Sequence, residues 1–489
     1  MKDIRANAFA NMLVKLLNIV FPLITTAYLS RVLSKPLYGE FNIANTYLNL
    51  FVPFATFGVY NYGIREISKV KDNKDKINHM FSALFYVSVG CTLITTLLFL
   101  GCIPLYTASP NVRMLIYILT IQLVSQMFYI EWMNEAFEDY SFIFYKTFIF
   151  RIIMLVSIFM FVKKSDDIMI YALILSLSHL GNYLASFIWI KRSVKFVKVK
   201  LSFYKRLYRP LIGLFLLANA NMLYTLLDRT FIARVGIPED VSNYTNGQNI
   251  VMLIVGVVGG AVSVSVPRLG YYLGKRDHEA YRELIYKGSR WFSLAIAPIG
   301  MGLAVLGTQA TVLMYSDKYV AGGIVTTIFA IRTISWAIEI LLGTQVILIN
   351  GFENKLTKFY FVGGAMNFML NSLLYANGMA NPAYYVVTTI LSEYVVIFLE
   401  YSFIRNAKLL DVKPIFATFA KYASISLGFV PISLAIKYLY PVEMSVSGPF
   451  LLSIVMIIIA CVIYYVAVLW MTKDEMFIQA QSVIKEKLA

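Results

Sequence analysis

Charged residues are scarce in this chain of 489 residues, where Asp, Glu, Lys and Arg together account for 14% of positions. About a quarter is usual in soluble domains. Hydrophobic residues make up 59%, and the mean hydropathy is +0.69. This composition excludes an ordinary soluble domain and predicts an all-α polytopic membrane protein.

Cysteine and histidine are also rare, with three residues of each. Cys91, Cys102 and Cys461 lack the spacing of a disulfide framework or metal site, so we expect them to be packing residues. The three histidines are too scattered to form a catalytic set. We therefore expect no metal, no cofactor and no enzymatic activity. The first hydrophobic segment is too long, and too polar on one face, for a cleavable signal peptide.

The chain contains fourteen apolar segments that are long enough to cross a bilayer, which requires about 20 mostly apolar residues each. They are separated by short loops on one side and longer basic loops on the other. Such short loops exclude a large external catalytic domain. The predicted spans are 8–30, 38–62, 79–102, 112–133, 142–162, 168–190, 209–233, 241–267, 291–315, 322–350, 357–376, 383–404, 417–439 and 446–472.

Most of the 43 Lys and Arg residues fall in the loops of one side of the predicted membrane. Such an asymmetry predicts that this side, with both termini, is cytoplasmic. The net charge of +16 is then explained by topology and by anionic lipid headgroups, so no nucleic-acid partner is expected.

The chain shows signs of duplication, since the spacing between Arg31 and Arg65 recurs between Arg234 and Arg268. Six spans separate the repeats, so both copies keep the same orientation in the membrane. We therefore predict two six-helix lobes, related by a parallel repeat, around a central polar cavity. The expected parts are an N-lobe at 1–190, a basic cytoplasmic linker at 191–208, a C-lobe at 209–404, and accessory helices 13 and 14 with a cytoplasmic tail at 405–489.

Polar residues line one face of the opening helices of both repeats. Asn18 lies on such a stripe in the first span, Asn45 in the second, and Asn221 and Asp228 at the start of the second repeat. Polar faces of membrane helices must face inward. Hydrogen bonding between helices explains any single Asn equally well, but stripes in both repeats favour a shared lumen.

Charges at membrane depth are unfavourable by about 2.5–3.5 kcal/mol each, so each is a candidate for function. An excess of such cations indicates an anionic passenger, and the Asn stripes suit sugar hydroxyls. Structural ion pairs and headgroup contacts are the alternatives for individual residues. The candidate substrate-binding residues are Lys15, Asn18, Asn45, Arg65, Arg151, Asn221, Arg229, Arg268 and Arg332.

Several segments have a recognisable pattern: 22–33 (Pro-Leu-Ile-Thr-Thr-Ala-Tyr-Leu-Ser-Arg-Val-Leu), 38–40, 62–69, 131–140 and 227–229. Together they resemble bacterial Wzx-type polysaccharide flippases of the multidrug/oligosaccharidyl-lipid/polysaccharide exporter superfamily. The chain departs from that pattern at Ala27 and Ser34, where the family often has proline and glycine.

The resemblance implies that undecaprenyl-diphosphate-linked oligosaccharide repeat units, of O-antigen or capsule type, are flipped across the bacterial cytoplasmic membrane by alternating access. Membrane lipids, H⁺ or Na⁺, a polysaccharide polymerase and a chain-length regulator are the other partners implied. By this resemblance Lys15, Arg151, Arg229 and Arg332 would neutralise the diphosphate or acidic sugars. The candidates for ion coupling are Asp228, Glu339 and Glu393.

Other functions remain open at this point. A flippase for lipid II or for a teichoic-acid-type precursor would also need cations. A drug or ion antiporter of the same superfamily usually needs a carboxylate in the first lobe, where this chain has Lys15 and asparagines. A membrane polysaccharide polymerase or acyltransferase is more remote, because the outer loops are short and His179 has no acidic or nucleophilic companion on its helix.

Overall fold

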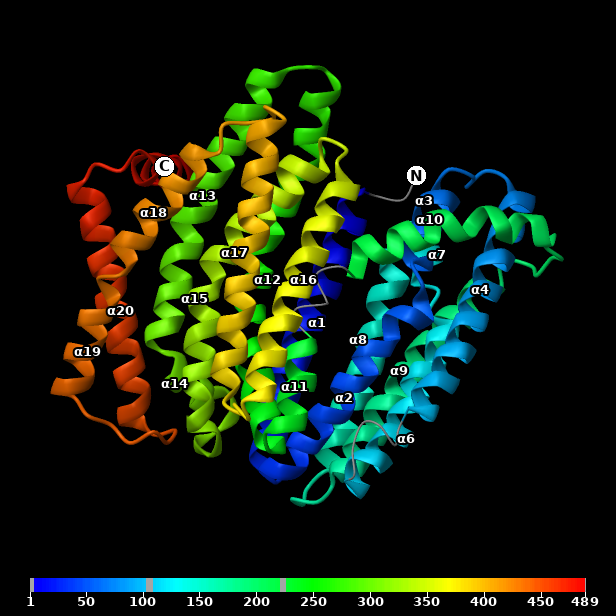
Figure 1. The fold of residues 1–489 in the computed structure, drawn as a ribbon, viewed down its shortest axis with the longest axis horizontal. Coiled ribbons are helices and arrows are strands. Elements are labelled where there is room, and N and C mark those ends of the chain that lie inside the picture. The colour runs from blue at the N-terminus through cyan, green and yellow to red at the C-terminus, as the bar shows by residue number, and fades with distance from the viewer. Residues whose placement is uncertain (1–3, 103–108, 220–225, 489) are drawn as a thin grey trace. The chain divides into compact units, whose positions relative to one another are not determined.

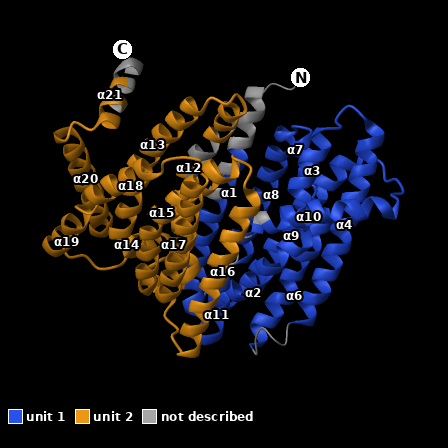
Figure 2. Ribbon diagram, turned by 45° about the horizontal axis from the view of Figure 1, so that its top comes forward, with its two compact units in different colours: residues 1–242 blue, residues 243–489 orange. Residues whose placement is uncertain are grey.

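The computed structural model describes residues 4–102, 109–219 and 226–488, and all regular elements within these ranges are helices. The chain divides into two compact units, Met1–Ser242 and Asn243–Ala489, shown in two colours in Figure 2. The all-α prediction is thus confirmed. The lobes predicted from the sequence, at 1–190 and 209–404, have boundaries that differ from those of the two units. These lobes remain a prediction.

Eight helices among the described residues are long and apolar enough to cross a membrane. A ninth span results if α13 (His278–Val305) and α14 (Gly307–Tyr315), which are bent by 75° at their junction, are counted as one. The protein is therefore a multi-pass membrane protein. Helices also occur at the other predicted spans, but the number fourteen remains a prediction.

Unit 1 contains the first half of the chain, whose course can be followed from blue to green in Figure 1. The boundary with unit 2 falls inside α12 (Pro238–Gly274). The other helices of unit 1 are α1 (Ile4–Val32), α2 (Lys35–Thr56), α3 (Val59–Ser68), α4 (Lys74–Gly101), α6 (Pro110–Ser125), η1 (Gln126–Phe128), α7 (Glu131–Ala136), α8 (Tyr140–Phe161), α9 (Ile168–Lys191), α10 (Leu201–Asn219) and α11 (Leu227–Val235).

Local sequence signals set several of these helix ends. The Asn73 side chain accepts a hydrogen bond of 3.0 Å from the backbone N–H of Lys76 and so caps α4. The predicted span 38–62 is broken between α2 and α3, where Phe57 and Gly58 have φ angles of 39° and 73°. Gly58 suits this left-handed turn because it has no Cβ.

The core of unit 1 includes a tight contact between α3 and α7. Trp132 is 1% exposed, and its ring lies 2.4 Å from the position that a Cβ on Gly63 would occupy. Only glycine permits so close an approach. This contact holds α7, which begins at Glu131, against α3, which carries Tyr60, and both residues reappear in the site described below.

Unit 2 continues through the last part of the chain, from green to red in Figure 1. Helices α13, α15, α17 and α16 follow one another as packed neighbours. The remaining helices are η3 (Asp317–Gly322), α15 (Gly323–Ile340), the π-helix η4 (Leu341–Leu348), α16 (Glu353–Ala376), α17 (Pro382–Asn406), α18 (Lys413–Ser426), α19 (Phe429–Leu439), α20 (Gly448–Met471) and α21 (Glu475–Leu488).

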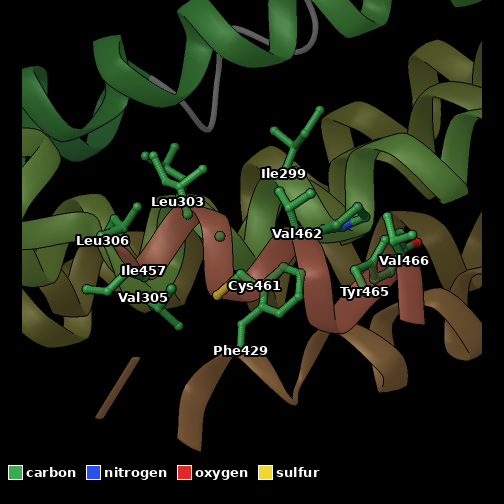
Figure 3. A pocket seen from close by; sticks show the side chains of 13 residues that line it. Ile299, Leu303, Val305, Leu306, Phe429, Ile457, Cys461, Val462, Tyr465 and Val466 are labelled. Atoms are coloured by element: carbon green, nitrogen blue, oxygen red, sulfur yellow. The ribbon is translucent and has the colours of Figure 1, made fainter. Parts of the chain in front are cut away.

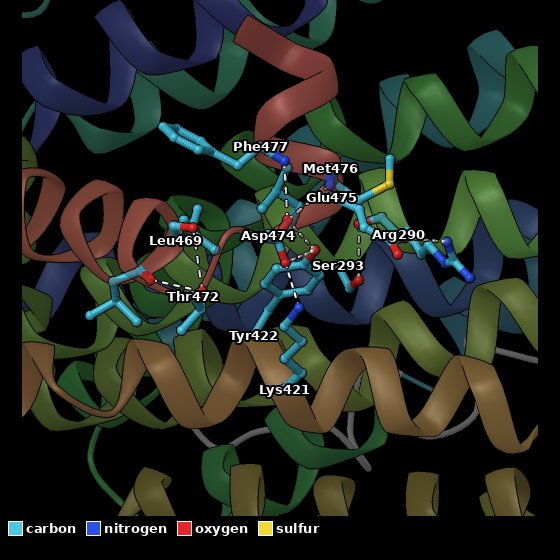
Figure 4. A network of polar contacts seen from close by, with 12 residues as sticks. Arg290, Ser293, Lys421, Tyr422, Leu469, Thr472, Asp474, Glu475, Met476 and Phe477 are labelled. Atoms are coloured by element: carbon cyan, nitrogen blue, oxygen red, sulfur yellow. Dashed lines mark hydrogen bonds and ion pairs between the residues drawn. The ribbon is translucent and has the colours of Figure 1, made fainter.

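A buried carboxylate links the final helix to the rest of unit 2. Asp474 is 2% exposed and caps α21 by accepting 3.0 Å hydrogen bonds from the backbone N–H groups of Met476 and Phe477 (Figure 4). Lys421 Nζ and the Tyr422 hydroxyl, both on α18, donate to it at 2.5 and 3.1 Å. Burial alone raises the pKa of Asp474, but the hydrogen bonds from Lys421 and Phe477 outweigh it and hold the pKa below its ordinary value.

Candidate functional site

A polar cavity of about 340 Å³ lies within unit 1. Residues of α1, α3, α7, α8 and α9 line it, so segments far apart in the sequence meet there. Two of the predicted substrate-binding residues, Asn18 and Arg151, are among them. Its wall combines charged, amide and aromatic side chains, which is the mixture expected of a site for a polar ligand.

Asn18 and Arg151 contact each other across this cavity. Arg151 Nη2 donates to Asn18 Oδ1 at 3.3 Å and thereby joins α8 to α1. Within the described residues this is the hydrogen bond found for the guanidinium, which has five N–H donors. Arg151 thus retains donors that can contact a phosphate or a hydroxyl in the cavity.

The opposite charges of Lys146 and Glu131 form a closed network beside Arg151. Lys146 Nζ and Ser186 Oγ both donate to Glu131 Oε1, and Asn134 Nδ2 donates to Glu131 Oε2 at 3.2 Å. Lys146 and Glu131 are buried. Because its ammonium is committed to Glu131, Lys146 serves mainly to hold α8 against α7 and α9, and Arg151 supplies the more available positive charge.

Aromatic side chains form another part of the same wall. The rings of Tyr60 and Tyr129 stack with centroids 5.8 Å apart, and Tyr129 and Tyr183 are 4.9 Å apart. His179 meets the edge of Tyr183 at 5.9 Å. The Tyr60 hydroxyl donates to Glu135 Oε1 at 2.7 Å, which fixes that ring. Flat ring faces beside hydrogen-bonding groups are suited to sugar rings, which have both apolar and hydroxyl-bearing surfaces.

The clearest charge pair of unit 2 joins α15 to α17. Arg332 Nη2 and Nε lie 3.0 and 3.2 Å from the two carboxylate oxygens of Glu393, and Ser335 Oγ donates to Glu393 Oε2 at 2.5 Å. All three residues are buried. This bidentate geometry favours a structural ion pair as the role of Arg332, which was one of the alternatives raised by the sequence. The carboxylate partner in this pair is Glu393.

The other predicted residues occupy different environments. Asn45 is partly buried in α2, and Asp228 and Arg229 are buried in α11. Arg65 is exposed and pairs with Glu66 at 2.9 Å, while the exposed Arg268 donates to the Tyr272 hydroxyl at 3.3 Å. Glu339 is buried in α15. The Lys15 side chain and Asn221 lie outside the described residues.

Several residues of this cavity are not among the candidates that the sequence predicts. Glu131 and Glu135 belong to the segment 131–140 that carries the family resemblance, which was the available signal for them. Lys146 had the signal of a charge within a predicted span, which did not identify its partner. His179 and Tyr129 had no signal of their own, because a lone histidine does not identify its partners and aromatic residues make up 15% of the chain.

An apolar cavity of about 450 Å³ lies between α13, α19 and α20 of unit 2. Figure 3 shows side chains such as Leu303, Phe429 and Val462 around it. Cys461 lines it as well and has a free thiol, as expected for a packing residue. The lining is almost entirely hydrocarbon, so the cavity suits an alkyl or isoprenoid chain.

A family model described as "Polysaccharide biosynthesis protein" matches residues 4–272, which is more than half of the chain. The chain belongs to this family. Membership agrees with the resemblance to polysaccharide flippases drawn from the sequence. The match covers the whole of the described cavity of unit 1, including Asn18 and Arg151.

Two further similarities extend along most of the chain. A candidate O-antigen transporter of Escherichia coli (strain K12) is 22% identical over 415 residues, which cover 83% of this chain and 98% of the relative. The structure titled "Lipid II flippase MurJ, inward closed conformation" has a TM-score of 0.73 at 13% identity, covering 96% of this chain and all of that one. An inward-facing MATE multidrug transporter has a TM-score of 0.60 at 12% identity, covering 79% of this chain and 94% of that one. These two structures share the fold.

Proposed function

We propose that this protein flips undecaprenyl-diphosphate-linked oligosaccharide repeat units from the inner to the outer leaflet of a bacterial cytoplasmic membrane. Both termini are then cytoplasmic, as the Lys and Arg asymmetry predicts. Family membership and the similarity to a candidate O-antigen transporter support this function. The relatives reported above are named as transporters or flippases, and none is named as an enzyme.

The observation that carries the proposal is the contact between Arg151 and Asn18 in a cavity with an aromatic wall. A guanidinium binds a phosphate oxygen with charge-assisted hydrogen bonds, and an amide binds a sugar hydroxyl. The rings of Tyr60, Tyr129 and Tyr183 supply stacking surfaces. One cavity thereby offers groups for both the diphosphate and the first sugars of such a substrate.

The lipid part of the substrate requires a different environment. The cavity between α13, α19 and α20 is lined by hydrocarbon, so a polyprenyl chain can occupy it without desolvating a polar group. We assign the polyprenyl chain to this cavity. The proposal thus separates a polar site in unit 1 from an apolar site in unit 2.

Transport by alternating access needs two conformations and a source of free energy. We propose the predicted lobes at 1–190 and 209–404 as the moving parts, with the linker at 191–208 between them. Ion coupling is assigned to the buried acidic residues Asp228, Glu339 and Glu393. An ion that binds one conformation more tightly shifts the equilibrium toward it, which is the physical basis of coupling.

Two alternatives use the same fold. A lipid II or teichoic-acid-type precursor also carries a phosphate-linked polyprenyl chain, and the fold similarity to a lipid II flippase makes it the stronger second candidate. A drug antiporter would bind cations, whereas Arg151 places a positive charge in the cavity of unit 1. A polysaccharide polymerase remains the remote alternative.

Depletion of the protein in cells that label lipid-linked oligosaccharide tests the proposal. Label should accumulate on the cytoplasmic leaflet and return to the outer leaflet when the wild-type gene is restored. Normal delivery to the outer leaflet, with unpolymerised repeat units outside, would overturn the proposal in favour of a polymerase. Accumulation of lipid II instead would support the second candidate.

A further inference from the structure

Glu400 of α17 is a fully buried acid with an exceptional environment. Its exposed fraction is 0%, and within the described part of the chain neither carboxyl oxygen has a hydrogen-bond partner. Glu393 lies two helical turns earlier on the same face of α17, and it is matched by Arg332. The guanidinium of Arg332 is therefore engaged with a carboxylate other than Glu400.

The backbone next to Glu400 is shaped to admit its carboxyl group. Glu400 Oε1 lies 2.9 Å from the position that a Cβ on Gly343 would take, and the Tyr360 hydroxyl lies 3.0 Å from the same point. Gly343 belongs to the π-helix η4, an irregular form of helix that occurs frequently at functional sites. Tyr360 lies near both Glu339 and Glu400, whose charges act on its hydroxyl, so these two acids share this region.

The charges around Glu400 do not balance if every acid is ionised. Arg332 and Glu339 come from α15, Tyr360 from α16, and Glu393 from α17, while η4 contributes no charged residue. Lys358 and Arg405, on α16 and α17, are exposed. Among the described residues of α15, η4, α16 and α17, the buried charged groups are thus one guanidinium and three carboxyl groups.

Simple electrostatics determines whether Glu400 is ionised or neutral. An unpaired ionised carboxylate in a low-dielectric interior is so unfavourable that the group takes up a proton instead. A neutral carboxyl group without a hydrogen-bond partner is unfavourable by only about 1–3 kcal/mol. The geometry therefore requires a neutral Glu400 in this conformation.

We propose that Glu400 is a proton-binding site, formed with Glu339 and Tyr360 beside the π-helix η4, and that it joins the acidic residues of the ion coupling proposed above, with the proton as the coupling ion. The role in transport rests on the proposed function, whereas the binding of the proton does not. In this conformation Glu400 holds the proton. A conformation that admits water to η4 allows Glu400 to ionise, and the proton thereby biases the equilibrium between the two.

A proton fits this site better than a metal ion. Among the residues that the structure describes, no three His, Cys, Asp or Glu side chains converge in the manner of a metal site. Proton binding needs only the Glu400 carboxyl group itself.

Infrared spectroscopy of the purified, full-length protein in lipid vesicles tests the proposal directly. At neutral pH the wild type should show the carbonyl stretch of a protonated carboxylic acid, and Glu400→Gln should lose that band. The matched control Glu353→Gln, at an exposed acid in the first turn of α16, should keep it. Gly343→Ala, which crowds the carboxyl group, should shift the band without abolishing it.

The outcomes separate this proposal from the proposed function. A wild type without the band, or a band that survives in Glu400→Gln, overturns the proton site even if flipping in cells is intact. Loss of the band when Na⁺ replaces choline at constant pH overturns the proton in favour of sodium. If the band depends on Glu400 but depleted cells flip normally, the site stands and the proposed transport function fails.

Discussion

Arg332 on α15 donates two hydrogen bonds to the carboxylate of Glu393 on α17, with nitrogen to oxygen distances of 3.0 and 3.2 Å. Both residues are buried, at 7% and 0% exposure. The pair uses the guanidinium within the protein, so its first role is to join two helices of unit 2. A substitution at Arg332 is therefore expected to affect the stability of the protein.

Arg332→Ala should lower the stability of the protein by about 3–5 kcal/mol, because it leaves Glu393 as an uncompensated buried charge. The double variant Arg332→Leu with Glu393→Leu should recover much of that loss, since it removes both charges. Thermal unfolding in detergent and abundance in the membrane measure the effect. Wild-type stability of Arg332→Ala, combined with lost export, would instead give Arg332 a direct role in substrate binding.

Tyr129 provides a test of sugar stacking in the cavity of unit 1. Tyr129→Phe retains the ring and should export repeat units at nearly the wild-type rate, whereas Tyr129→Ala should reduce export by up to about tenfold, from a stacking energy of about 0.5–1.5 kcal/mol. Initial rates of export, normalised to membrane abundance, measure the difference. Equal losses in both variants would show that the hydroxyl matters and the ring face does not.

Gly63 tests the packing that positions this cavity. Gly63→Ala places a methyl group 2.4 Å from the buried ring of Trp132, and such overpacking is unfavourable by about 1–3 kcal/mol. Gly90→Ala on α4 is the matched control, because its new Cβ has no described atom within 4 Å apart from the backbone of its own helix and its chain neighbours. We expect a lower unfolding temperature for the first variant and no decrease for the second. Equal unfolding temperatures would contradict the close contact between α3 and α7.

The lowered pKa of Asp474, which caps the C-terminal helix α21, predicts how the stability of the protein depends on pH. Its pKa is lower in the folded protein than in the unfolded chain, so its contribution to stability is complete above the ordinary Asp value of about 3.9. That contribution is lost as the pH falls below this value through the folded pKa. Thermal unfolding of wild type and Asp474→Asn should therefore differ most near neutral pH and converge on acidification. A difference that is constant with pH would show that the carboxylate charge is unimportant.

The sequence predicts the helices of this protein better than their interruptions. Long apolar runs determine where helices form, and over the residues that it describes the structure has helices within each of the predicted spans. The break at Phe57 and Gly58 and the π-helix around Gly343 depend on tertiary contacts that leave no periodic signal. The bend between α13 and α14 has the same origin.

The candidate site shows a similar division. Asn18 and Arg151 could each be selected from the sequence, since polar and charged residues within apolar spans stand out. Their contact could not, because 133 positions separate them and only folding brings α1 and α8 together. Glu400 was overlooked because an acid near a helix end normally reaches water, and only the structure shows that it is fully buried.

The proposed substrate site depends most on Arg151, which lines the polar cavity of unit 1 and retains available donors. The decisive measurement follows labelled lipid-linked oligosaccharide on each leaflet in depleted cells that express Arg151→Ala. Loss of charge-assisted hydrogen bonds of about 1.5–3 kcal/mol should slow delivery to the outer leaflet by about 10- to 100-fold. Arg206→Ala, which removes an exposed arginine from α10, is the control and should restore wild-type delivery. Wild-type delivery by Arg151→Ala, at equal abundance, would contradict the account.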